Sequence, residues 1–90
     1  MDNMTAEEFN LKYISHLETG FDGLMIDNPN VTQYLDCVFG AMSEKYKEKF
    51  TYSQIKIKFG ESRVYLTPNE IPISAIEETI DFLLKANIRK

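Results

Sequence analysis

Few residues of this chain could carry out covalent or acid–base chemistry, since His16 is the only histidine and Cys37 the only cysteine. A catalytic histidine needs an orienting partner and a proton target, and a nucleophilic thiol needs a neighbour that lowers its pKa. The spacing of the sequence supplies neither. We expect His16 to be an ordinary partly buried or surface side chain, and Cys37 to be an exposed, inert thiol. The sequence therefore predicts no catalytic residue and no enzyme activity.

Two groups of carboxylate and amide side chains resemble cation sites at first sight. The first lies in one loop and consists of Asp22, Asp27, Asn28 and Asn30. It lacks the EF-hand spacing, which places a glycine at the sixth position and an acid at the twelfth. The second consists of Glu77, Glu78 and Asp81. These acids fall where the start of a helix favours negative charge, so we predict no metal site and no cofactor.

The segment Gln54–Thr67, QIKIKFGESRVYLT, predicts a β-hairpin. Apolar and polar residues alternate on both sides of Gly60, which places the two sets on opposite faces of a pleated ribbon. The turn is either the pair Gly60-Glu61 or a four-residue loop that closes Phe59 on Val64. Both turns give the same inner set, which is Ile55, Ile57, Val64 and Leu66.

The outer face of this hairpin carries candidate nucleic-acid-binding residues. They are Lys56, Lys58, Arg63 and Tyr65. Cations can neutralise phosphates, and an aromatic ring can stack on a base. The whole chain, however, has a formal charge of −4, whereas nucleic-acid-binding domains are usually basic. Nucleic-acid binding is therefore the alternative functional prediction.

The leading functional prediction comes from the first helix, which has apolar residues on two sides. Leu11 and Ile14 point away from the stripe that we expect to face the core. A helix that is apolar on two sides is either deeply packed or in contact with another chain. The candidate protein interface is Leu11, Ile14 and Glu18, with Glu7 and, on the second helix, Tyr34 at its rim. We predict a small non-enzymatic regulatory or inhibitory protein that acts through a protein partner or self-association.

Helix signals define the elements that must position these residues. The first helix is expected from Ala6 to about Thr19, with a capping box between Thr5 and Glu8. Its core stripe is Phe9, Tyr13 and Leu17. Gly20 suits the left-handed residue that ends a helix.

The second helix is expected from Pro29 to about Lys49, because proline is favoured in the first turn. Asn28 or Asn30 is its cap. The preceding segment Leu24–Asp27 either adds a third strand or fills the core, and the sequence does not separate these alternatives.

The last helix is expected from Ala75 to about Ile88, with a second capping box between Ser74 and Glu77. The predicted fold is α+β in the order α-α-β-β-α, with the hairpin packed against three helices. The length of 90 residues predicts one globular domain over residues 1–90.

Composition and charge complete the expectations. The hydrophobic share of 43% is that of an ordinary globular chain. Residues 1–43 carry seven acids and one base, whereas residues 44–63 carry six bases and three acids. This uneven charge could steer a charged partner to one side. The start lacks the basic and apolar regions of a signal peptide, no apolar run is long enough to span a membrane, and the lone cysteine favours a reducing compartment. We therefore expect a cytoplasmic protein with no evident small-molecule ligand.

Overall fold

A mixed three-stranded sheet organises the chain. In the computed structural model, which describes residues 4–47 and 49–88, the short strand β1 (Gly23–Leu24) pairs in parallel with β2 (Thr51–Lys58), which pairs antiparallel with β3 (Glu61–Thr67). The helices are α1 (Ala6–Lys12), α2 (Pro29–Tyr46) and α3 (Ile73–Ile88). The α+β class and the helix–helix–strand–strand–helix order are confirmed, with β1 added between the first two helices.

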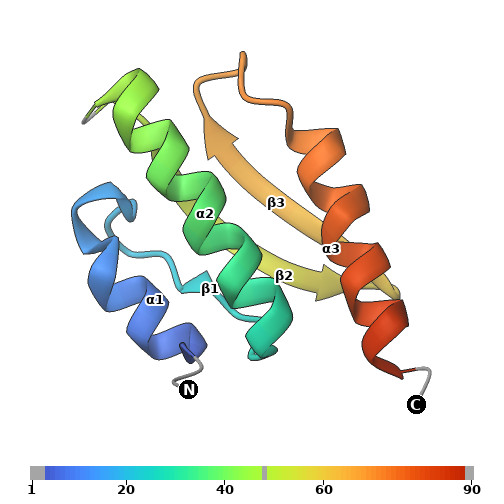
Figure 1. Cartoon of the computed structure of the whole chain (residues 1–90). Coiled ribbons are helices and arrows are strands. Elements are labelled where there is room, and N and C mark those ends of the chain that lie inside the picture. Colours follow the sequence, from blue (N-terminus) through green and yellow to red (C-terminus); the bar gives the residue numbers. More distant parts are fainter. Residues whose placement is uncertain (1–3, 48, 89–90) are drawn as a thin grey trace.

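Aromatic rings join the helices to the sheet. Helix α2 crosses one face of the sheet, with α1 and α3 at its two sides (Figure 1). The Phe39 ring of α2 lies 4.9 Å from that of Phe9 in α1 and 5.0 Å from that of Tyr52 in β2. All three side chains are fully buried. Edge-to-face pairs of this kind add to the stabilisation from burial, so this cluster fixes α1 and α2 on the sheet.

The first helix is shorter than the sequence predicts. The capping box of Thr5 and Glu8 is confirmed, but α1 ends at Lys12 instead of about Thr19, and a 3₁₀ turn, η1 (Ile14–His16), follows. The chain then reaches the sheet, where the Glu18 amide donates to the Tyr52 carbonyl at 2.9 Å. A helix continued to Thr19 could not make this contact. Tertiary pairing therefore overrides the helical periodicity.

The second helix begins as predicted and ends early. Asn28 is its cap, because its side-chain oxygen accepts from the amides of Asn30 and Val31. The helix ends at Tyr46 and not near Lys49, since Lys47 has a positive φ of 59°. Phe50, although fully buried, lies in the segment that leads into β2.

The segment before α2 fulfils both of its alternatives in part. Leu24 belongs to β1, opposite Ile55 in the parallel register. Ile26 lies beyond the strand and is buried in the core. Residue 25 between them is exposed, as alternation along an extended chain requires.

The hairpin forms one residue out of the predicted turn register. Lys58 pairs with Glu61, so the two turn residues are Phe59 and Gly60, with φ of 55° and 79°. Both predicted turns are therefore wrong. Two consecutive positive φ values match the twist of a type I′ hairpin turn.

The inner face of the hairpin follows the prediction except near the tip. Ile55, Val64 and Leu66 are buried. Ile57 shares their face, opposite Ser62 in the register, but it remains 44% exposed. Ser62, opposite Ile57, is buried and bonds to α3, so the helical cover at this level lies over β3 and leaves Ile57 of β2 half exposed.

The third helix begins at Ile73, two residues before the predicted start. Ser74 therefore lies inside the helix, and the predicted capping box with Glu77 is wrong. The Glu77 carboxylate instead accepts from the Val64 amide at 2.9 Å, and the Asp81 carboxylate accepts from the Ser62 amide at 2.9 Å. One turn apart, these two acids lie on the same side of α3 and face the outer edge of β3.

Candidate functional site

The outer face of the hairpin brings together the residues predicted for nucleic-acid binding. In the antiparallel register Lys56 lies directly opposite Arg63, and Lys58 lies opposite Glu61. Arg63 also forms an ion pair with Glu61, at 3.4 Å between Nη1 and Oε1. Like charges directly opposite in a sheet are destabilising. The face thus holds two adjacent cations at a cost in stability, and it has one acid beside them.

An aromatic side chain stands at each end of this basic cluster. Tyr65 follows Arg63 on the same face of β3 and is 47% exposed. Phe59 occupies the turn and is 88% exposed, with the Lys58 ammonium 5.6 Å from its ring centroid. In the sequence, Phe59 follows Ile55 and Ile57 at the next alternate position, which by alternation alone would put it on the inner face. The position of Gly60 as second residue of a type I′ turn is the signal that would have placed Phe59 at the tip.

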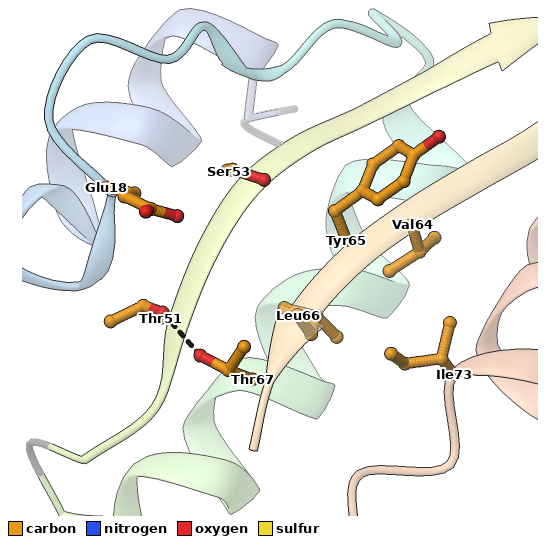
Figure 2. A pocket seen from close by; sticks show the side chains of 8 residues that line it. All are labelled: Glu18, Thr51, Ser53, Val64, Tyr65, Leu66, Thr67 and Ile73. Atoms are coloured by element: carbon orange, nitrogen blue, oxygen red, sulfur yellow. Dashed lines mark hydrogen bonds between the residues drawn. The ribbon is translucent and has the colours of Figure 1, made fainter. Parts of the chain in front are cut away.

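A shallow hollow of about 220 Å³ lies beside Tyr65 (Figure 2). Its polar lining is Glu18, Thr51, Ser53, Tyr65 and Thr67. The hydroxyls of Thr51 and Thr67 are 2.6 Å apart and form a hydrogen bond across the two strands. These oxygens can donate to or accept from a ligand.

The residues of the predicted protein interface do not form one surface. Leu11 and Ile14 are 66% and 56% exposed, and Glu7, one helical turn before Leu11, is exposed as well. Glu18 instead lines the hollow on the sheet. Tyr34 lines a separate groove.

That groove of about 310 Å³ lies between α2 and the start of α3. Besides Tyr34 it is lined mainly by apolar residues of both helices, including Val38, Met42 and Ile76. On α2, the flank that faces α1 carries Asp36, which bonds to Lys12 and Tyr13. Tyr34 is two positions from Asp36, so the helical period of 100° per residue places it on the opposite flank. Tyr34 therefore cannot be the rim of a patch centred on Leu11.

His16 is more buried than the predicted partly buried or surface position, whereas the prediction of an exposed Cys37 is confirmed. The imidazole of His16 is buried, stacked on the Phe50 ring at 3.9 Å, and its Nδ1 lies 3.1 Å from the Phe50 carbonyl oxygen. Cys37 is exposed. Within the described residues, no group of three or more His, Cys, Asp or Glu side chains could hold a metal ion.

Two of the loop residues that resemble a calcium site, Asp27 and Asn28, form local structural contacts. Asn28 caps α2, and the Asp27 carboxylate accepts from the Ala6 amide at 3.1 Å. These contacts tie the start of α1 to the start of α2.

The most perturbed titratable groups form a link between α1 and α2. The Tyr13 hydroxyl donates to the Asp36 carboxylate, which also lies 2.9 Å from Lys12 Nζ. Burial, followed by the Asp36 hydrogen bond, raises the pKa of Tyr13 well above its usual value. Burial alone would raise the pKa of Asp36, but the hydrogen bonds from Tyr13 and Lys12 outweigh it and leave this pKa lowered. Each group thus keeps one protonation state near neutral pH, which suits a structural contact.

Asn10 is a key residue that the sequence does not reveal. Its side chain forms two hydrogen bonds with the backbone of Leu24, donating to the carbonyl at 3.1 Å and accepting from the amide at 2.9 Å. The Tyr52 hydroxyl donates to the same side-chain oxygen at 2.8 Å, and burial raises the pKa of Tyr52 to about 12. Asn10 therefore takes the place of a neighbouring strand at the outer edge of β1.

No family model, curated protein or solved structure matches this chain. The functional proposals below accordingly depend on the geometry of the molecule itself. In the described part of the chain, none of the helices combines the length and the apolar character that crossing a membrane requires.

Proposed function

We propose that this protein is a small non-enzymatic regulatory or inhibitory protein that acts by binding another protein. The observation that carries the proposal is the exposure of Leu11 and Ile14, by 66% and 56%, on consecutive turns of α1 and η1. Exposed apolar neighbours of this kind mark interaction surfaces more often than isolated ones do. The proposal includes a cytoplasmic location, supported by the single cysteine.

The surroundings of this apolar pair define the partner. Glu7 lies one turn before Leu11, and Lys12, the one lysine or arginine of residues 1–43, is paired with Asp36 at 2.9 Å. The surface is therefore apolar with an acidic border. Such a surface favours a partner with basic residues around an apolar patch, because complementary charge sets the association rate and the specificity.

A double substitution tests this proposal. Leu11→Ser with Ile14→Ser removes the apolar pair, and Met25→Ser, at an exposed apolar residue elsewhere, is the matched control. Sedimentation velocity reports self-association, and quantitative capture from source-cell extract reports a partner. We expect the double variant to lose the association that wild type and Met25→Ser retain, with thermal unfolding unchanged. Equal association of all three proteins, or unfolding of the double variant, would contradict the proposal.

A second candidate function, nucleic-acid binding, is supported by the position of Lys56 directly opposite Arg63. Two facing cations disfavour each other, and a bound phosphate would relieve this repulsion. The outer face of the hairpin shares no residue with the Leu11 and Ile14 surface, so the two proposals are independent. Fluorescence anisotropy with labelled oligonucleotides at low salt tests the second. Lys56→Ala with Arg63→Ala should weaken binding, and Lys85→Ala on α3 should not.

A further inference from the structure

We propose that the hairpin binds single-stranded nucleic acid and that the ring of Phe59 stacks on one of its bases. This inference deepens the second candidate function and rests on it. It assigns a role to the most exposed large apolar side chain among the described residues.

Phe59 is a poor choice for the stability of the turn. Its φ of 55° lies in the left-handed region, which favours glycine and asparagine, whereas other L-residues are disfavoured there. The side chain is 88% exposed, so burial provides no compensation for this conformation. Strained positions that the fold does not need are candidates for function.

The fold holds the base of the hairpin tip firmly. Ser62, three residues after Phe59, donates its amide to Asp81 and its hydroxyl to the Glu77 carbonyl, each at 2.9 Å. Both acceptors lie on α3, a helix of 16 residues. The aromatic ring thus projects from a braced support, and a preorganised support lowers the ordering cost of binding.

The charges beside Phe59, three cations against the single acid Glu61, favour a polyanion. The Lys58 ammonium lies 5.6 Å from the ring centroid, and Lys56 and Arg63 follow along the outer face. Alternating cations and aromatic rings are the general design of single-strand binding surfaces, since phosphates pair with the cations while bases stack on the rings. A protein partner could bind the same three cations only through a surface that carries acidic residues.

Tyr65 supplies a second ring on the same face. From Glu61 beside the turn to Tyr65 the strand rises about 13 Å, so the two rings can contact different nucleotides of one strand. The hollow beside Tyr65 adds the hydroxyls of Thr51 and Thr67, which can bond a base edge or a sugar. Because both rings need unstacked bases, a single strand fits this face and a duplex does not.

The test measures anisotropy of labelled oligothymidine and of a duplex over a range of salt. Three cations predict a slope of log K against log salt of about −2 for a single strand. Phe59→Asn, which suits the turn, should weaken binding about 5- to 150-fold, the range of base–aromatic stacking, with the slope unchanged. Phe59→Trp should retain affinity. Lys56→Ala with Arg63→Ala should instead reduce the slope to about −0.7.

The outcomes separate the inference from the function on which it rests. If Phe59→Asn binds like wild type while the double cation variant loses affinity, the stacking role is overturned and nucleic-acid binding stands. Equal affinity for duplex and single strand also overturns the stacking role. If wild type binds no oligonucleotide at low salt, both are overturned. Loss of a protein contact on Phe59→Asn, without oligonucleotide binding, reassigns the ring to a protein partner.

Discussion

The backbone amide of Val64 donates to the Glu77 carboxylate at 2.9 Å, across the edge of the sheet. Together with the Asp81 contact to the Ser62 amide, it satisfies two amides that an edge strand would otherwise expose. Unpaired strand edges are templates for aggregation, which proteins suppress with charge or by covering the edge. Helix α3 does both here, because its carboxylates bring charge to the edge of β3 and also cover the edge amides.

Removal of either carboxylate should loosen β3. We expect Glu77→Ala and Asp81→Ala each to lower the free energy of unfolding by about 1–3 kcal/mol, since each leaves a part-buried amide without a partner. Hydrogen exchange followed by NMR should show faster exchange of the Val64 amide in the first variant and of the Ser62 amide in the second. Glu78→Ala, at an exposed neighbour, is the control. Equal exchange rates in all variants would show that the edge contacts do not protect β3.

Loss of the Asn10 side chain should release β1. Asn10→Ala removes two bonds to Leu24 and the acceptor of the Tyr52 hydroxyl, so we expect a loss of about 2–4 kcal/mol by denaturant unfolding. Gly23→Ala should act similarly, because a Cβ there would lie 2.5 Å from the Asn10 oxygen and Gly23 has a φ of 75°. Gly40→Ala, where an added Cβ meets nothing within 4 Å, is the control and should gain about 1 kcal/mol from helix propensity. If the free energy of unfolding of Asn10→Ala equals that of wild type, Asn10 does not take the place of a neighbouring strand.

Acidification should remove the contribution of Asp36. Its pKa is lowered in the folded protein, so its stabilisation is complete above the unfolded-state value of 3.8 and is lost as the pH falls through the folded-state pKa. Asp36→Asn should therefore cost of order 1 kcal/mol at neutral pH and progressively less below about pH 4. Thermal unfolding of both proteins from neutral to acidic pH measures this. If the stability difference between wild type and Asp36→Asn does not change with pH, the effect comes from packing and not from the charge of Asp36.

Replacement of Phe59 by asparagine should stabilise the fold. Asparagine followed by glycine is favoured in type I′ turns, and relief of the left-handed strain should add about 1 kcal/mol to the free energy of unfolding. Phe59→Ala, which keeps the strain but removes the ring, is the control and should change stability little. Urea unfolding of the three proteins decides this. A loss of stability in both variants would mean that the ring packs on the fold.

Short-range physics determined much of this molecule from sequence alone. The capping box of Thr5 and Glu8, the Asn28 cap and the alternation that buries Ile55 and Val64 all depend on residues within a few positions of one another. Such signals act before any tertiary contact forms, and they predicted the α+β class and the element order.

Tertiary structure decided the features that involve residues far apart in sequence. Helix α1 stops at Lys12 because the chain must reach Tyr52, which lies in β2. Glu77 bonds to Val64 and not to its own helix start, since a carboxylate can satisfy either donor and only the packing of α3 brings the strand edge close. Asn10 likewise bonds to the edge of β1 only because the fold brings α1 against this strand.

The candidate surfaces divide in the same way. Alternation within one hairpin placed Lys56 and Arg63 on one face, because a strand repeats every two residues whatever the turn. The tip residue depended on the turn register, which the fold shifted by one position to expose Phe59. The interface that joined Leu11 to Tyr34 depended on how two helices pack, and local sequence carries no information about that arrangement. The structure separates these residues because α1 packs on the flank of α2 that carries Asp36.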